Sequence, residues 1–271
     1  MAPPRREHTR ARRAFGQNFL SDPRQVRRLA AVAGIRPGDL VYEVGAGRGT
    51  LTGELARRTA NLVAYEVDPQ VAAGLPELPG VTVRVADFLR AEPPDRPFGV
   101  VGNIPYGLTS AVVDWCLRAD TLTAATLLTQ LEYARKRTGD YGRWTRLTVR
   151  TWPLVRWTLA GRIPRSAFRP APRVDGGILR LERRPAPLVE PPALPAYRSF
   201  VETGFTGAGG SLHASLSRRY GDRRVAAAFR AARLATGVPV GLVWPEQWLT
   251  LFRLIRPGSV PPPPAAPRPP R

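Results

Sequence analysis

The chain has 271 residues, 43% of them hydrophobic, and its 41 Lys and Arg against 21 Asp and Glu give a formal net charge of +20. This length buries roughly three quarters of the unfolded surface and suffices for one large domain or for a core with an appendage. Such an excess of positive charge is typical of proteins that approach phosphate backbones, so nucleic acid is the expected partner. The single cysteine, Cys116, and only two histidines exclude an internal disulfide and argue against metal sites and His-dependent triads.

The two ends of the chain and its hydropathy indicate where the protein works. No apolar run approaches the roughly 20 residues that span a bilayer, and the N-terminus lacks the apolar core of a signal peptide, so we expect a cytoplasmic protein without a membrane role. Residues 1–14 form a basic arm that either binds nucleic acid or only solvates the chain. Residues 257–271 form a Pro/Ala/Arg-rich tail that we expect to be disordered.

The first elements predict a nucleoside-binding site. Gln17 and Asn18 precede a helix N-cap sequence at 21–23, where their amides either line a pocket or belong to a turn. A predicted strand at 39–44 then leads into the glycine-rich sequence Gly45-Ala46-Gly47-Arg48-Gly49, and a helix follows at 51–58. The glycines let the backbone approach a ligand closely, although the spacing is G-x-G-x-G and not the full dinucleotide fingerprint. A second strand at 62–65 ends at Glu66, in the position where a carboxylate binds a ribose diol.

Two further strand ends extend this site. A strand at 81–85 is followed by Asp87 and Phe88, an acceptor and an apolar wall that suit an adenine edge. A strand at 99–102 is followed by Asn103-Ile104-Pro105-Tyr106. Pro105 restricts Ile104 to an extended backbone, so that the Ile104 carbonyl can point into a pocket, while the Asn103 amide can hold an exocyclic amine and Tyr106 offers a flat face to a base. An ordinary proline turn is the alternative, but ligands bind at the carboxyl edge of an open parallel sheet, where four successive strands place these groups.

The remaining elements are predicted from periodicity. In the first part of the chain we expect a helix at 108–118, a strand at 124–128, a short basic helix at 130–137, a mobile loop at 138–144, a pair of strands within 147–163 and a last strand at 177–181. Phe168, in the basic loop 165–175, either closes the pocket opposite Tyr106 or packs in the core. Beyond a proline-rich boundary at 185–195, helices are expected at 197–205, 223–234 and 244–255.

Six motifs in this order carry a resemblance to a known family: Gly16-Gln17-Asn18-Phe19-Leu20, Glu43-Val44-Gly45-Ala46-Gly47-Arg48-Gly49, Glu66-Val67-Asp68, Asp87-Phe88, Asn103-Ile104-Pro105-Tyr106 and Phe168-Arg169-Pro170-Ala171-Pro172. Over roughly residues 12–255 the chain resembles the rRNA adenine N6-methyltransferases. It looks closest to the Erm enzymes, which methylate an adenine in 23S rRNA and confer resistance to macrolide, lincosamide and streptogramin B antibiotics. The stretches 143–153 and 165–175 look like the Erm forms of high-GC, antibiotic-producing bacteria.

The resemblance implies an α/β fold, a Rossmann-like sheet of the S-adenosylmethionine (SAM)-dependent methyltransferases with a small C-terminal α-helical domain. We expect a catalytic domain at 15–184 and a helical RNA-binding domain at 185–256. The residues implied to bind SAM are Gln17, Asn18, Leu20, Gly45, Gly47, Gly49, Glu66, Asp87, Phe88 and Asn103. Those implied to hold or stack the target adenine are Asn103, Ile104, Pro105, Tyr106 and Phe168.

The implied partner is 23S rRNA, before or during ribosome assembly, and we expect a monomer without a metal. Three alternatives share the motifs or the charge. One is the sibling enzyme that dimethylates adjacent adenines of small-subunit rRNA, and another is a catalytically silent nucleic-acid-binding descendant of the fold. The third is a SAM enzyme that acts on DNA adenine.

Overall fold

The structure, a computed structural model, describes residues 18–256; the basic arm, Gln17 and the tail lie outside the described residues. Among these residues, contacts divide the chain into two compact units, residues 18–135 with 156–183 and residues 136–155 with 184–256. The domain bounds expected from the sequence, 15–184 and 185–256, stay a prediction, and in the structure residues 136–155 lie in the second unit. Among the described helices, none is both long enough and apolar enough to cross a membrane.

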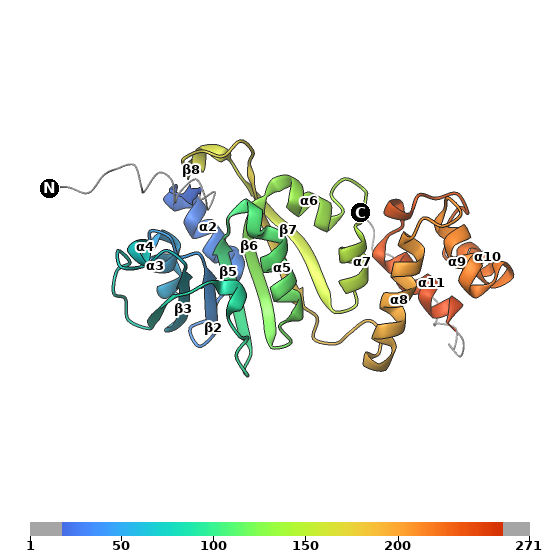
Figure 1. Cartoon of the computed structure of the whole chain (residues 1–271), viewed down its shortest axis with the longest axis horizontal. Helices are drawn as coiled ribbons and strands as arrows, with labels where there is room; N and C mark the ends of the chain where they lie inside the picture. The colour runs from blue at the N-terminus through green and yellow to red at the C-terminus, as the bar shows by residue number, and fades with distance from the viewer. Residues whose placement is uncertain (1–17, 257–271) are drawn as a thin grey trace, which may run out of the picture. The chain divides into compact units, whose positions relative to one another are not determined.

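The first unit is built on a seven-stranded sheet of order β4-β3-β2-β5-β6-β9-β7 (Figure 1). Neighbouring strands from β4 to β6 run parallel, and β9 is antiparallel to β6. The strands are β2 (Leu40–Val44), β3 (Asn61–Glu66), β4 (Val81–Val85), β5 (Phe98–Asn103), β6 (Leu122–Gln130), β7 (Val155–Ile163) and β9 (Gly176–Arg183). Parallel strands buried on both faces explain the apolar runs of β2 and β5, whose residues are mostly buried. The four strands expected to deliver the site, β2 to β5, therefore end at one edge.

Helices connect and cover these strands. They are α2 (Pro23–Ala33), α3 (Thr50–Ala56), α4 (Pro69–Ala72), α5 (Thr109–Arg118) and α6 (Leu131–Thr138), and Figure 1 shows α5 lying along β6. The predicted N-cap of α2 is confirmed, because the Asp22 carboxylate accepts a hydrogen bond from the Arg24 amide at 2.8 Å. A second, two-stranded sheet pairs β1 (Phe19–Leu20) with β8 (Phe168–Arg169) in antiparallel fashion. It fastens the start of the described chain to the loop before β9.

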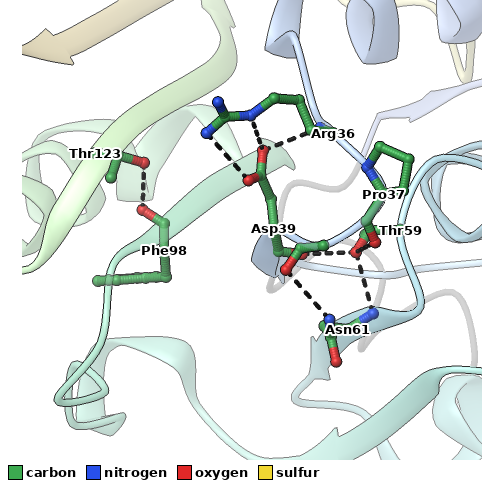
Figure 2. A network of polar contacts seen from close by, with 8 residues as sticks. Arg36, Pro37, Asp39, Thr59, Asn61, Phe98 and Thr123 are labelled. Atoms are coloured by element: carbon green, nitrogen blue, oxygen red, sulfur yellow. Dashed lines mark hydrogen bonds and ion pairs between the residues drawn. The ribbon is translucent and has the colours of Figure 1, made fainter.

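A polar network ties the beginnings of β2 and β3 together at the sheet edge away from the glycine loop (Figure 2). The Thr59 hydroxyl donates to the Asp39 carbonyl at 2.6 Å and accepts from the Asn61 amide at 3.1 Å. The Asp39 carboxylate accepts from the Arg36 backbone amide at 2.9 Å, and this bond lowers the pKa of Asp39. These bonds fix the register of the strands, so that their opposite ends arrive together at the site.

The second unit is helical, with α7 (Arg146–Thr151), α8 (Leu194–Phe205), α9 (Leu212–Tyr220), α10 (Asp222–Ala231) and α11 (Pro245–Ile255). One apolar core joins them, with Trp248, Tyr197 and Phe200 among its fully buried side chains. The Tyr197 hydroxyl donates to the Val149 carbonyl at 3.0 Å, so α7 is bound to α8 within this unit. The small helical domain expected from the sequence is present, with α7 added to it.

In the helical unit one prediction of secondary structure was wrong and one helix was missed. The segment 147–163 was expected to be a pair of strands, but its first part is α7 and only Val155–Ile163 is a strand. Thr145 caps α7 with its hydroxyl, and Val149 is buried in the helical core, so tertiary packing outweighs the β-branched composition. Helix α9 was not predicted, although Ser211 caps it and Leu212 and Leu216 carry its buried face at helical spacing.

Candidate active site

The carboxyl edge of the sheet surrounds a hollow with about 650 Å³ of space, its opening included. This edge of an open α/β sheet is where ligands commonly bind. The structure brings together nine of the predicted residues in its wall: Asn18, Leu20, Gly45, Gly47, Glu66, Asn103, Ile104, Pro105 and Tyr106. Sequence segments that lie up to 88 positions apart thus meet at one place.

The glycine loop and Glu66 form one side of the hollow. Gly45, Gly47 and Gly49 all have positive φ, at 74°, 55° and 79°, a conformation that side chains rarely adopt. The buried Glu66 carboxylate accepts from the Gly47 amide at 2.8 Å and from the Asp68 amide at 3.0 Å. Glu66 therefore holds the loop in shape, and a carboxylate with about four acceptor positions retains capacity for a ligand hydroxyl.

Asn103 lies across the hollow, at the end of β5. Its side-chain Nδ2 donates to the Asn18 carbonyl at 2.8 Å, which leaves Oδ1 as the acceptor of the amide. Asn18 is fixed in turn because β1 pairs with β8, with Leu20 opposite Phe168, and because both the Ser21 amide and its hydroxyl donate to the Ala167 carbonyl. The chain before α2 is thus a strap over the hollow, and Asn103 is oriented by it.

Ile104, Pro105 and Tyr106 continue this side. The Pro105 carbonyl accepts from the Leu108 amide at 2.9 Å, whereas the described residues provide no backbone donor to the Ile104 carbonyl. Tyr106 is half-buried and its hydroxyl has no partner among the described residues. Burial raises the pKa of Tyr106 to about 12, with the charge of Asp175 adding to the rise, so the ring is neutral at physiological pH. Together, Ile104 presents a carbonyl acceptor and Tyr106 presents an aromatic face.

Three predicted residues lie at the edge of the sheet but not in the wall of the hollow. Gly49 begins α3, and a side chain there would press on Leu75 and Pro76. Asp87 follows β4 and lies near Glu66, because the preceding Ala86 amide donates to the Glu66 carbonyl at 3.0 Å. The Asp87 carboxylate accepts from the Leu89 amide. The Phe88 ring is not an apolar wall for a ligand, because it is buried, with its centre 4.4 Å from that of Trp115.

Phe168 requires a correction. The sequence predicts a position for Phe168 either opposite Tyr106 or in the core, and the family resemblance predicts a role in holding or stacking the target adenine. In the structure its side chain is fully buried with Leu20, Ile163 and Ile178, and it does not line the hollow. Phe168 therefore packs, and its β8 backbone carries the strap.

Other residues at the site were missed. Phe19 and Arg48 line the hollow, with the Arg48 guanidinium carbon 5.1 Å from the centre of the Phe19 ring. Val67 and Val85 are 44% and 55% exposed next to Glu66, where apolar side chains suit a flat ring. Sequence position could have identified two of these residues, because Val67 follows Glu66 directly and Phe19 lies between the predicted site residues Asn18 and Leu20. Among residues 18–256, no group of three His, Cys, Asp or Glu side chains is arranged to hold a metal.

Glu43 is a further missed group, on β2 beneath the glycine loop. It is fully buried, and neither carboxylate oxygen has a hydrogen-bond partner among the described residues. Burial raises the pKa of Glu43 from 4.5 to about 7; the neighbouring Thr52 hydroxyl, whose geometry falls short of a hydrogen bond, partly offsets this rise, and the charge of Glu66 adds to it. A buried carboxyl of this kind favours the neutral form.

Glu43 should make the stability of the protein depend on pH. Because its folded pKa lies above the unfolded one, the contribution of Glu43 to stability is fully present below about pH 4.5 and is lost as pH rises toward 7. At about 1.4 kcal/mol per pKa unit the loss is about 3 kcal/mol. Glu43→Gln has no carboxyl to ionise. We therefore expect its unfolding free energy minus that of the wild type to increase by about this amount between pH 5 and pH 8, as measured by denaturant titrations. A constant difference across this range would contradict the buried carboxyl.

The chain is similar to known proteins over most of its length. A family model described as ribosomal RNA adenine dimethylase matches residues 8–256. An rRNA methyltransferase of Streptomyces thermotolerans is 56% identical over 252 residues, which is 92% of this chain and 84% of that protein. An rRNA adenine N-6-methyltransferase of Streptomyces fradiae is 54% identical over 92% of this chain and 80% of its own. The crystal structure of the 23S rRNA methyltransferase ErmE superposes with a TM-score of 0.85 at 52% identity, covering 88% of this chain and 99% of that one.

Proposed function

The chain belongs to the ribosomal RNA adenine dimethylase family and is an rRNA adenine N6-methyltransferase, and from this premise we propose that it methylates one adenine of 23S rRNA. One or two methyl groups at N6 would give resistance to macrolide, lincosamide and streptogramin B antibiotics. The similarity to ErmE supports the choice of 23S rRNA. The observation that carries the proposal is a single hollow with the glycine loop and Glu66 on one side and Asn103 to Tyr106 on the other.

We propose SAM as the methyl donor, and the residues present fit it. When bound, it supplies a methyl group that its sulfonium already activates. Asn18, Leu20 and the loop from Gly45 to Gly49 would surround the methionine part, with Gln17 adjoining them in sequence. Glu66 would accept from the ribose hydroxyls with the lone pairs that its two backbone donors leave open. Asp87 and the Phe88 backbone would then bind the adenine edge, with Val67 and Val85 beside it.

The substitution Gly47→Ala should weaken SAM binding. At φ 55° an added Cβ is strained, and it would lie 3.0 Å from the Phe19 ring, so the loop must move. We expect the Kd for SAM, measured by calorimetry, to rise at least about tenfold, equivalent to about 1.4 kcal/mol. Gly53→Ala is the matched control, because a Cβ there has nothing within 4 Å and the residue lies within α3. Equal affinities in the two variants would contradict the role of the loop.

The target amine would be held by two acceptors. The adenine N6 lone pair is delocalised into the ring and is a poor nucleophile, so the task of the protein is to localise and aim it. Asn103 Oδ1 and the Ile104 carbonyl, neither of which is engaged by a donor among the described residues, can each accept one N–H. This favours a pyramidal nitrogen whose lone pair faces the methyl group, and such positioning supplies several kcal/mol. No covalent intermediate with the protein is required.

The target adenine must leave its stack to reach these acceptors. Unstacking costs a few kcal/mol, and less in a single-stranded loop. The Tyr106 ring would offset this cost by stacking on the base. Since Phe168 is buried in the core, Tyr106 is the aromatic side chain that we assign to this role.

We propose that the RNA is bound by the basic surface of the chain before or during ribosome assembly, by a monomer in the cytoplasm. The helical unit presents exposed arginines for phosphate contacts, among them Arg218, Arg219, Arg223 and Arg224. Such contacts make affinity fall steeply with salt concentration.

The decisive experiment is to incubate the protein with methyl-labelled SAM and total rRNA, separate the 23S and 16S molecules, and map the modified base. We expect label at N6 of one adenine in 23S rRNA. Label confined to 16S rRNA would identify the small-subunit sibling instead. In a parallel incubation with DNA, labelled adenine would indicate a SAM enzyme that acts on DNA, and the absence of transfer to either nucleic acid would indicate a silent member of the family.

A further inference from the structure

Three tryptophans of the second unit form a row of tilted and edge-to-face rings, called here the tryptophan stack, that ends at the surface. The ring centre of Trp144 lies 5.5 Å from that of Trp152 and 5.5 Å from that of Trp244. The Arg184 guanidinium covers the inner end, 5.2 Å from the Trp152 ring. Trp144 is only 8% exposed, whereas Trp244 is 54% exposed. The stack therefore presents one large aromatic side chain to solvent and supports it from below.

This support is rigid. The Trp144 amide donates to the Gly241 carbonyl at 2.7 Å, which joins the turn before α7 to the segment before α11. The Trp144 ring lies so close to Gly139 that any side chain at that position would overlap it. The Trp244 amide donates to Gln247 Oε1 at 2.9 Å and so fixes the first turn of α11. Trp244 is thus held in place by its backbone and by Trp144, and a ligand would bind to it without ordering a loop.

Exposed apolar and basic side chains stand close in sequence to Trp144 and Trp244. Tyr141 and Leu242, from the same two joined segments, are 51% and 40% exposed. Residues 135–150 contain six Lys or Arg side chains and one acidic residue, Asp140. Two of them, Arg146 and Arg150, share Glu202 as a partner, whereas Arg143 is exposed and has no carboxylate partner among the described residues. Large apolar side chains that are left exposed together often mark a binding surface.

We propose that Trp244 is a stacking platform for an unpaired base of the RNA substrate, with Arg143 contacting the adjoining phosphate. The inference rests on the proposed rRNA substrate and adds a second contact point, in the helical unit, to the base held at Tyr106. Aromatic faces flanked by basic side chains bind single strands because every base has a face that stacks. The positive charge of the chain favours this occupant over a protein partner.

The test compares two RNA probes of equal length, an unpaired oligonucleotide and a blunt duplex, against wild type, Trp244→Ala, Trp244→Phe and Arg143→Gln. For the unpaired probe we expect Trp244→Ala to weaken binding roughly tenfold, equivalent to about 1.4 kcal/mol, and Trp244→Phe to recover most of it. For the duplex we expect Trp244→Ala to match wild type. Arg143→Gln should lower the salt dependence of binding to the unpaired probe, since one phosphate contact is lost.

Two results would overturn the proposal. Unchanged affinity of Trp244→Ala for the unpaired probe would assign the surface to another partner, such as a protein. An equal loss for both probes would show a general effect on folding or charge, which the thermal midpoint of the variant would also detect. Arg223→Gln serves as the control for charge alone, because this exposed arginine lies on α10 and should weaken both probes alike.

Fluorescence provides a second measurement that does not depend on activity. Stacking of a base on Trp244 should quench the intrinsic emission of the wild type when the unpaired probe is added, and Trp244→Phe should lose most of this change. Methylation of rRNA by the wild type is assayed in parallel. If the wild type methylates 23S rRNA but Trp244→Ala binds the unpaired probe as tightly as the wild type, only the stacking inference fails. If the wild type methylates no RNA, the proposed function fails.

Discussion

Replacing Asn103 by alanine is expected to lower kcat for methyl transfer by on the order of 10²–10³-fold, while SAM still binds. The variant removes Oδ1, one of the two acceptors that we assign to the target amine. It also removes the Nδ2 donor to the Asn18 carbonyl, so the strap over the hollow loses one contact and the Kd for SAM should rise modestly. The signature is therefore a large fall in kcat with a small change in cofactor affinity.

Asn61→Ala is the matched control for this experiment. The Asn61 side chain (Figure 2) also donates to a backbone carbonyl, that of Gly38 at 3.3 Å, but Asn61 begins β3, whose other end carries Glu66. Single-turnover rates with saturating SAM and calorimetric affinities are measured for both variants. We expect Asn61→Ala to retain wild-type turnover. Wild-type turnover in Asn103→Ala would refute the amine-holding role.

Phe168→Ala is expected to destabilise the first unit by about 3–5 kcal/mol, the usual cost of removing a fully buried aromatic ring. The ring is enclosed by the core that contains Leu20 and Ile178, and its backbone pairs with Leu20 of the strap. The cavity should therefore loosen the strap as well, so that SAM affinity falls together with stability. Denaturant unfolding and calorimetry measure the two effects.

A more conservative substitution separates packing from stacking. Phe168→Leu keeps most of the apolar volume but offers no aromatic face, so we expect it to retain kcat if Phe168 only packs. A fall in kcat as large as that expected for Asn103→Ala, with stability preserved, would restore Phe168 to the catalytic residues. Ile178→Ala is the comparison for stability alone, because Ile178 is fully buried in the same core on β9 and does not line the hollow.

Local sequence features predicted the strands that carry the site. The apolar runs of β2, β3 and β5 end at glycines or at Glu66 and Asn103, and in a parallel sheet such ends meet at one edge. The Asp22 cap of α2 was equally visible. These features are local in sequence, and at these positions backbone preference and burial favour the same conformation.

Elements whose conformation depends on distant partners were not predictable in this way. The segment 146–151 has β-branched residues but is helical because Val149 is buried in the helical core and Tyr197 bonds to its carbonyl. Helix α9 is short and serine-rich, and its helical state follows from the core that Leu212 and Leu216 enter.

By itself, the sequence determined the chemistry of this protein: which strand ends carry the glycine loop, Glu66 and Asn103, and how strongly the chain attracts phosphate. Only the tertiary structure decided which side chains face the hollow. It buried Phe168 and the Phe88 ring, placed Phe19 and Arg48 in the wall, and left Trp244 at the surface. The reason is physical, since burial depends on which segments far apart in sequence pack together, and an aromatic residue in a loop suits a core and a binding site equally well.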